Sequence, residues 1–154
     1  MPRYSIIIGL LAVSGAISDR DIPHLKDDGF DAIIDVRAEG RDNEYLIGKN
    51  GLKYLHVEID DQGAPSLKQL KDIFAFAEPI LKGGRRILVH CKNGCGRSPL
   101  ITVSVLVKTG MDVAEAAGLL KEKHARTGFS PMQDSFINTE LVSMIGLIAD
   151  EGCK

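Results

Sequence analysis

The stretch from residue 85 to residue 107 constrains the fold more than any other part of this chain, because it joins two apolar segments through a short loop that contains glycine. Residues 85–90 lie between glycines on both sides and are apolar at their centre, which predicts a short buried strand. Residues 100–107 are rich in β-branched side chains, which favours a strand, but Pro99 stands where a helix would begin. We predict a helix, and because it is apolar on all sides we expect it to be buried against a sheet.

The rest of the chain alternates between short apolar stretches and segments with helical spacing. Ser66 and Gln69 have the spacing of a capping box, and apolar residues follow at helical intervals up to residue 81. Such alternation predicts an α/β fold, with a mostly parallel central sheet of about four to five strands flanked by helices on both faces. A length of 154 residues suits one domain, residues 1–154. The other predicted strands are 4–11, 31–37 and 53–59, with a loop at 39–51. A short helix is predicted with Ser18 as its N-cap and Gly29 as its stop, and further helices are predicted from Asp112 and Ser130.

Composition argues against several classes of protein. The formal net charge is −2, so the chain as a whole is not attracted to nucleic acid or to an acidic membrane. No apolar run approaches the roughly 20 residues of a membrane-spanning helix, and Gly9 interrupts the apolar N-terminal stretch, which favours a strand over a secretory leader. Three cysteines make a poor disulfide framework and suit a reducing compartment. We therefore expect a cytoplasmic protein without nucleic-acid or membrane partners, and the sequence leaves its oligomeric state open.

Cys91 and Arg97 stand at the two ends of the loop between the predicted strand and helix, with five residues between them. Successive backbone N–H groups in such a turn form a nest for an anion, and the start of the helix adds partial positive charge. If the loop curls, the guanidinium of Arg97 can hold two oxygens of one phosphate in a planar fork. The same donors favour the thiolate of Cys91. The arrangement predicts a thiolate that faces a bound phosphate.

The segment His90-Cys91, five residues, Arg97-Ser98 after an apolar strand resembles the signature of the protein tyrosine phosphatases, and most closely that of their small dual-specificity branch. Residues 52–61 are similar to the strand and loop that carry the general acid of this family. Residues 130–136 are similar to a segment that carries a water-positioning glutamine in several members. The order and spacing of the elements match over nearly the whole chain.

The resemblance implies hydrolysis of a phosphomonoester in two steps. Cys91 attacks phosphorus to form a phosphocysteine, and Asp61 protonates the leaving oxygen and then activates water. Arg97 holds the phosphate oxygens, Ser98 donates a hydrogen bond to the departing thiolate, and Gln133 places the water. The resemblance implies a phosphorylated protein or peptide as substrate, with no cofactor and no metal. The remaining phosphate-binding groups are the loop amides of Lys92, Asn93, Gly94, Cys95 and Gly96.

The identity of the acid and the role of the glutamine stay open. Asp60 and Asp61 are adjacent and either can be a solvated turn carboxylate, although the register of the resemblance favours Asp61. Gln133 stands three residues after Ser130, so it also has a complete structural role in a capping box.

Cys95 lies inside the loop and has two interpretations. It is either a side chain of convenient size in the loop wall or a thiol that traps oxidised Cys91 as a disulfide. Cys153 is expected to be an exposed thiol near the C-terminus. The histidines outside the motif lack the spacing of metal ligands, so we expect structural or surface roles for His24, His56 and His124.

Three other functions compete with a protein phosphatase. The same chemistry can act on a non-protein phosphate, such as an inositol phosphate, a lipid or an RNA 5′-phosphate. A phosphate-binding module without turnover would lack the nucleophile, the acid or the arginine, and all three are present here. A sulfurtransferase of the rhodanese type also carries a cysteine in an anion-binding loop, but that loop usually has four residues before the arginine, not five.

Overall fold

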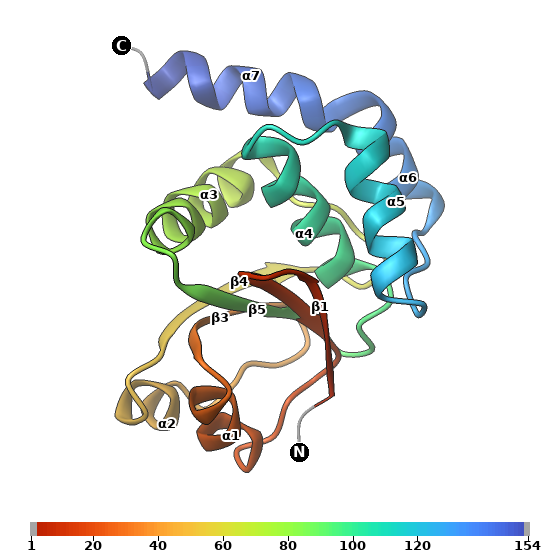
Figure 1. The fold of residues 1–154 in the computed structure, drawn as a ribbon. Helices are drawn as coiled ribbons and strands as arrows, with labels where there is room; N and C mark the ends of the chain where they lie inside the picture. The colour runs from red at the N-terminus through yellow and green to blue at the C-terminus, as the bar shows by residue number, and fades with distance from the viewer. Residues whose placement is uncertain (1–2, 153–154) are drawn as a thin grey trace.

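The computed structural model of the chain describes residues 3–152, which fold around one five-stranded sheet (Figure 1). The strand order is β1-β2-β5-β3-β4, and only the pair β1–β2 is antiparallel. This arrangement confirms the predicted α/β fold with a mostly parallel sheet. The strands are β1 (Tyr4–Ile8), β2 (Leu11–Ser14), β3 (Phe30–Arg37), β4 (Lys53–Ile59) and β5 (Arg86–His90).

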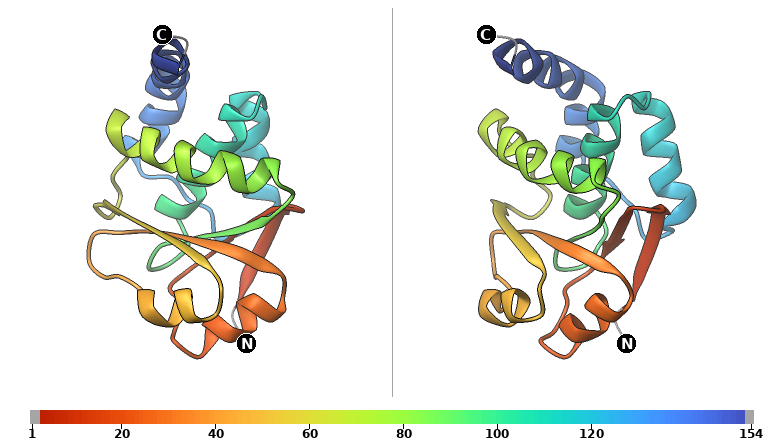
Figure 2. Two further views of the ribbon diagram at one scale, coloured as in Figure 1. Left: turned by 90° about the vertical axis from the view of Figure 1, so that its left-hand side faces the viewer. Right: turned by 60° about the vertical axis from the view of Figure 1, so that its left-hand side comes forward.

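Helices cover both faces of the sheet, as Figures 1 and 2 show. The short helices α1 (Asp21–Asp27) and α2 (Glu44–Lys49) cover one face over a small apolar cluster that includes Phe30 and Ile47. The larger core lies on the other face. Within the described residues, every helix is too short or too polar to cross a bilayer. The larger face carries α3 (Leu67–Lys82), α4 (Arg97–Lys108), α5 (Val113–Lys123), α6 (Pro131–Ser135) and α7 (Leu141–Gly152), with a π-helical turn at Phe136–Glu140 between the last two.

The central helix α4 is the segment whose composition was ambiguous between strand and helix. Its side chains are buried from Arg97 to Leu106, so it packs against the sheet on one side and against other helices on the other. The hydroxyls of Thr102 and Ser104 donate to the carbonyls four residues earlier, at 2.8 and 2.9 Å, which satisfies them without a partner outside the helix. The β-branched residues thus fill a core, and their strand propensity is overridden by packing.

Both predicted capping boxes form. Ser66 and Gln69 exchange hydrogen bonds of 3.1 and 3.0 Å at the start of α3, and the amide of Gln69 also donates to the carbonyl of Glu58, at the end of β4. Ser130 and Gln133 form the second box, at the start of α6. Each box therefore fixes the position of a helix start relative to the rest of the chain.

The N-terminal prediction of one strand at 4–11 is wrong, because the chain turns back on itself at Gly9 and Leu10. Residues 4–8 and 11–14 pair as an antiparallel hairpin, with Ile6 opposite Ala12. Every residue of β2 is buried, because this strand also pairs with β5 in parallel. The apolar run contained two strands, of which the second is buried and the first is partly exposed, and Gly9 marked the turn between them.

Two further details differ from the sequence-based prediction. Ser18 does not cap α1: Arg20 takes the N-cap position, and Asp21 accepts hydrogen bonds from the backbone N–H and hydroxyl of Ser18 at 2.8 and 3.2 Å. The stretch 39–51 is not a loop throughout, since it contains α2. Asn43 caps this helix by accepting from the N–H three residues later, and the buried Ile47 anchors it.

Candidate active site

The loop between β5 and α4 curls around the sulfur of Cys91, which lies at the carboxyl end of a central strand. The N–H of Gly94 points at this sulfur at 3.2 Å, and the hydroxyl of Ser98 lies 3.2 Å from it. Ser98 also lies within 3.2 Å of the carbonyl of Ser14, to which it can donate. Cys91 is 2% exposed, so its thiol forms the floor of the loop.

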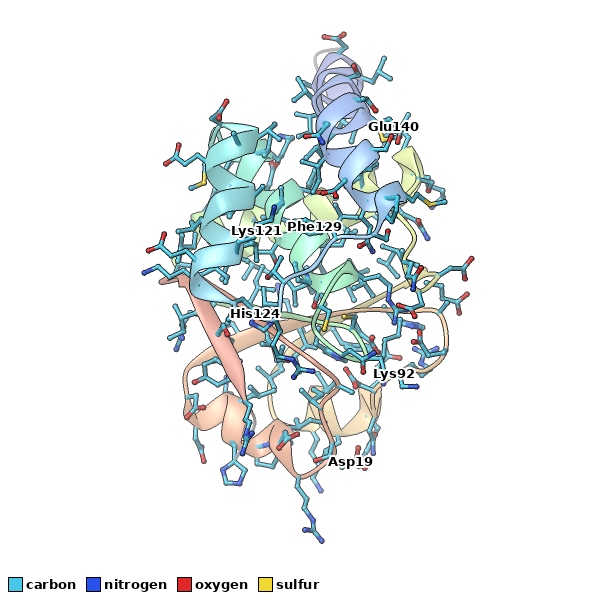
Figure 3. The ribbon with its side chains drawn as sticks, turned by 90° about the vertical axis from the view of Figure 1, so that its right-hand side faces the viewer. Asp19, Lys92, Lys121, His124, Phe129 and Glu140 are labelled. Atoms are coloured by element: carbon cyan, nitrogen blue, oxygen red, sulfur yellow. The ribbon has the colours of Figure 1, made fainter. Side chains whose placement is uncertain are left out.

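Three carbonyl groups of the loop are held from outside by other segments of the chain. Lys92 accepts from the N–H of Ala16 at 2.9 Å, and Cys95 accepts from the N–H of Gly128 at 2.8 Å. Gly94 accepts from Nε2 of His124 at 2.6 Å, and Figure 3 shows this histidine at the end of α5 beside the loop that carries Lys92. No sequence pattern indicated a role for His124, which lies far along the chain from the motif.

Two glycines allow the loop its close contacts. Gly94 has a φ of +70°, and a Cβ there would lie 2.7 Å from the backbone nitrogen of Gly15. A Cβ on Gly96 would lie 2.6 Å from Oε1 of Gln133, so this glycine lets Gln133 pack directly on the loop. Neither position tolerates a side chain without movement of its neighbour.

Arg97 is 2% exposed and its guanidinium is fixed by three hydrogen bonds. Nη1 and Nη2 each donate to the carboxylate of Glu39 at 2.6 Å, and Nη1 also donates to the carbonyl of Ile59 at 2.9 Å. These contacts occupy the Nη1–Nη2 edge of the guanidinium. The second edge, formed by Nε and Nη2, is the one at which an oxyanion can bind in a bidentate manner.

Arg97 and Glu39 shift each other's pKa. The hydrogen bond from Arg97 lowers the pKa of Glu39 to about 2. The pKa of Arg97 is raised, mainly by its hydrogen bond to Glu39, and the charge of Cys91 acts in the same direction while burial opposes both. Sequence reasoning missed Glu39. Its only signal was a position just beyond β3, at the same edge of the sheet as Cys91.

The loop after β4 brings the predicted acid toward the arginine. Oδ1 of Asp61 lies 3.8 Å from Nη2 of Arg97, and its side chain is 71% exposed. Asp60 is also exposed, and its carbonyl accepts from the N–H of Gly63 within the turn. Gln62, next to Asp61, has a φ of +63°, so the turn is sharp at this point.

Residues at the start of α6 hold this loop in place. The hydroxyl of Ser130 donates to the carbonyl of Gln62 at 2.7 Å, and Nε2 of Gln133 donates to the carbonyl of Gly63 at 3.0 Å. Gln133 is 1% exposed, and its Oε1 accepts from the N–H of Ser130 in the capping box. The capping role and an inward orientation therefore coexist in this side chain. A cavity of about 360 Å³ lies here, lined by Asp61, Asn93, Cys95, Gly96, Gln133 and neighbouring residues of both loops.

His90 connects the loop to a buried polar network behind it. Its Nε2 lies 2.5 Å from Oδ2 of Asp42, and its Nδ1 lies 3.3 Å from the carbonyl of Cys91. These two contacts on opposite sides of the ring fix its orientation. Asp42 in turn accepts from Arg37 at 3.1 Å.

Asp35 lies at the centre of this network and is fully buried. Burial raises its pKa, but the hydrogen bonds from Arg37 and the charge of His90 outweigh that effect, and the pKa is lowered. Tyr54 donates to Asp35 at 2.9 Å, and its own pKa is raised, first by burial and then by the nearby carboxylates. Ligand atoms of Asp35, Asp42 and His90 all lie within 4.8 Å of one another, and the guanidinium of Arg37 bonds both carboxylates and supplies the positive charge between them.

The remaining predicted residues lie around the mouth of the loop. Lys92 and Asn93 are exposed, and Cys95 is half-buried with its sulfur 3.5 Å from the carbonyl of Asn93. Cys91 and Cys95 are both free thiols in this structure. Cys153 lies outside the described residues.

Comparison with known proteins places this site in a family. A family model described as "Polymorphic toxin system, DSP-PTPase phosphatase" matches residues 8–111, well over half of the chain. Tyrosine-protein phosphatase CDC14 of Saccharomyces cerevisiae is 33% identical over 98 residues, which cover 60% of this chain and 18% of the yeast protein. Cyclin-dependent kinase inhibitor 3 of Sus scrofa is 29% identical over 119 residues, which cover 68% of this chain and 56% of that protein. The chain thus spans less than two thirds of the length of either relative.

Solved structures show the same fold over nearly the whole chain. Tk-PTP in its active form has a TM-score of 0.82 and 28% identity, with 92% of this chain and 97% of that chain covered. PTPMT1 in complex with PI(5)P has a TM-score of 0.82 at 20% identity, covering 97% of this chain and 98% of the other, which is a likeness of fold alone. The family predicted from the Cys91–Arg97 motif is therefore confirmed: this chain belongs to the DSP-PTPase phosphatases, within the protein tyrosine and dual-specificity phosphatases.

Proposed function

We propose that this chain hydrolyses phosphomonoesters of phosphorylated proteins through a phosphocysteine intermediate on Cys91. The observation that carries the proposal is the N–H of Gly94 directed at the sulfur of Cys91 at 3.2 Å, because it brings an amide of the loop within hydrogen-bond distance of the thiol. Arg97, whose Nη1–Nη2 edge is held by Glu39, has its other edge available for a phosphate oxygen pair. The proposed chemistry requires a reduced Cys91, which suits a reducing compartment such as the cytoplasm.

In the first step the thiolate of Cys91 attacks phosphorus, and the bond between phosphorus and the ester oxygen breaks. Asp61 donates its proton to that oxygen, so the product leaves as a neutral alcohol or phenol. The contact of 3.8 Å between Asp61 and Arg97 supports Asp61 over Asp60, because it brings this carboxyl to the group that binds the phosphate. The loop amides and Arg97 balance the charge of the phosphoryl group during the transfer.

In the second step water attacks the phosphocysteine, and the bond between phosphorus and sulfur breaks. Asp61, now ionised, accepts a proton from the water, and Cys91 leaves as a thiolate. The hydroxyl of Ser98, 3.2 Å from the sulfur, stabilises that thiolate by donating to it. Gln133 uses one donor and one acceptor within the protein, and the second hydrogen of its Nε2 and the second lone pair of its Oε1 serve to orient the water.

The carboxylates near the mouth favour a substrate with a single phosphate. Glu58, Asp60 and Asp61 line a cavity of about 490 Å³ between the segment that follows β4 and the start of α6, and Lys92 is an exposed positive charge on the loop that begins at Cys91. A polyphosphorylated inositol or an RNA 5′ end would bring further negative charge close to these groups. We therefore propose a phosphorylated side chain on a protein over a non-protein phosphate.

A direct experiment is the release of phosphate from an aryl phosphate in the absence of added metal. Cys91→Ser should abolish turnover, and Asp61→Ala should reduce kcat by roughly 10²–10⁴. Asp60→Ala is the matched control and should retain most of the activity. Rapid acid quenching should trap a phosphorylated Cys91 in the wild-type protein. Turnover by Cys91→Ser would refute the mechanism, and a larger loss in Asp60→Ala than in Asp61→Ala would move the acid by one residue.

A substrate panel tests the proposed class. Phosphotyrosine and phosphoserine peptides, an inositol phosphate, a phosphoinositide and an RNA 5′-phosphate are compared at equal concentration. The proposal predicts the highest kcat/KM for a phosphopeptide. A higher value for any of the non-protein phosphates would overturn the substrate class while leaving the chemistry of Cys91 intact.

A further inference from the structure

His124 makes an unusual pair of contacts for a residue outside the motif. It is 6% exposed, its Nε2 lies 2.6 Å from the carbonyl oxygen of Gly94, and its Nδ1 lies 2.7 Å from the hydroxyl of Ser5 on β1. A carbonyl oxygen only accepts hydrogen bonds, so Nε2 carries a hydrogen and donates it. The side chain thus fixes one peptide group of the loop.

That peptide group joins Gly94 to Cys95, and its orientation decides where the N–H of Cys95 points. In a trans peptide the C=O and the N–H point in opposite directions. His124 holds the carbonyl outside the loop, so the N–H of Cys95 is directed to the inside, the same side on which the N–H of Gly94 meets the sulfur of Cys91.

Gly94 is also the point at which the loop is easiest to deform. It has a φ of +70° and no side chain, so rotation of the following peptide meets little steric resistance. The carbonyls of Lys92 and Cys95 are held by backbone N–H groups, whereas the carbonyl of Gly94 is held by a side chain. Among these three contacts it is the one that a side-chain substitution removes.

The backbone around His124 places its ring firmly. Its N–H donates to the carbonyl of Leu120 at 2.9 Å at the end of α5, and its carbonyl accepts from Thr127 at 2.9 Å. Figure 3 shows the residue at the foot of that helix, next to the loop. The end of α5 therefore fixes the backbone of His124, and the ring is bonded to β1 on one side and to the loop on the other.

We propose that His124 is a positioning residue for the oxyanion site: its Nε2–H holds the carbonyl of Gly94 outward and thereby aims the N–H of Cys95 at a bound oxyanion. The proposal rests on the proposed function of this site and adds a residue that acts through the loop without touching the phosphate.

The test is the affinity of the protein for tungstate, a tetrahedral oxyanion, measured by isothermal titration calorimetry. His124→Leu removes the donor, and the dissociation constant should rise by about 10-fold to 100-fold, the range for one hydrogen bond to a charged group. His124→Gln places an amide N–H at the same number of bonds from the backbone as Nε2, and it should restore most of the affinity. Equal affinities of the leucine and glutamine variants would overturn the proposal.

Ser5→Ala separates positioning from simple stabilisation. It removes the contact on Nδ1 and weakens the connection between β1 and α5, but it leaves the bond to Gly94. Its melting temperature should fall while its tungstate affinity stays near the wild-type value. A loss of affinity equal to that of His124→Leu would show that the connection, and not the donor, matters. If His124→Leu is insoluble, His124→Asn replaces it, because its amide is one bond too short to reach Gly94.

Tungstate binding requires no turnover, so the two proposals fail separately. A wild-type protein that binds tungstate without hydrolysing an aryl phosphate would refute the proposed function alone. The comparison of the His124 variants would still decide whether this residue shapes the oxyanion site.

Discussion

The carboxylate of Glu39 receives two hydrogen bonds of 2.6 Å from the guanidinium of Arg97. Glu39 follows β3 and Arg97 begins α4, so the pair bridges two elements that the parallel sheet brings to one edge. An arginine at the first turn of a helix opposes the helix dipole, and the carboxylate offsets that repulsion. The pair also holds the planar guanidinium at a fixed angle, so one edge is ready to bind an oxyanion.

Replacement of this carboxylate should weaken catalysis more than folding. In Glu39→Gln the amide keeps one acceptor but presents N–H groups to a cation, so the orientation of Arg97 is lost. We expect kcat/KM for an aryl phosphate to fall by about 10-fold or more, since bidentate charged hydrogen bonds are among the strongest in proteins. The control is Glu44→Gln, whose partner Arg41 forms an exposed pair three residues away, and which should leave kcat/KM unchanged. An active Glu39→Gln variant would contradict a positioning role.

The same pair predicts a dependence of stability on pH. The pKa of Glu39 is lowered from 4.5 to about 2 by its hydrogen bond from Arg97. A lowered pKa means that the stabilisation is fully present above the unfolded value near 4.5 and is lost as the pH falls toward about 2. The effect is reduced by solvent, because the side chain of Glu39 is 40% exposed. Denaturant unfolding of the wild type and Glu39→Gln should give a free-energy difference that is constant above pH 5 and shrinks below pH 4; a difference that grows on acidification would refute this account.

Gly94 should be intolerant of even one methyl group. In Gly94→Ala the Cβ would meet the backbone nitrogen of Gly15 at 2.7 Å, and the φ of +70° is unfavourable for alanine. We expect loss of tungstate binding and of turnover, measured by calorimetry and with an aryl phosphate. Gly118→Ala is the matched control in α5, where an added Cβ meets open space, and it should raise the free energy of unfolding by roughly 0.5–1 kcal/mol. Full activity in Gly94→Ala would show that the loop is looser than its contacts indicate.

The two capping boxes offer a matched pair of variants. Ser66→Ala and Ser130→Ala each remove an N-cap, which costs about 1 kcal/mol of stability. Ser130 also donates to the carbonyl of Gln62, next to Asp61. Loss of this hydrogen bond should make the loop that carries Asp61 more mobile and therefore lower kcat as well. Ser66→Ala should keep the wild-type kcat. Urea unfolding measures the loss of stability, and steady-state kinetics measure the change in kcat. Identical kinetics for both variants would exclude coupling between α6 and the loop that carries Asp61.

Much of the fold followed from local patterns. The strand at 53–59 and the helix from Ser66 have boundaries that the alternation of apolar residues and the capping box indicate directly. The composition of α4 was ambiguous between strand and helix, and its burial in the core favours the helix. Its hydroxyls donate to carbonyls within the helix, so they can be buried. The hairpin at the N-terminus was missed because only Gly9 and Leu10 separate its two apolar strands, so no polar residue marked the turn.

The active-site loop could be predicted in outline, but its supports could not. Cys91 and Arg97 are close in the chain, and their spacing is the signal that indicated the proposed chemistry. Glu39 and His124 are far from them in sequence and resemble ordinary charged or polar residues there. Their contacts depend on the register of the parallel strands and on where α5 ends, which are properties of the assembled fold.

Three carbonyls of the loop accept hydrogen bonds from Ala16, His124 and Gly128. Ala16 is synthesised long before Cys91, and the other two are synthesised well after it. A nascent chain that ends at residue 98 already contains Cys91 and Arg97, but it lacks two of these three hydrogen-bond donors. The geometry of this loop is thus acquired late, when the last third of the chain docks against its first strand.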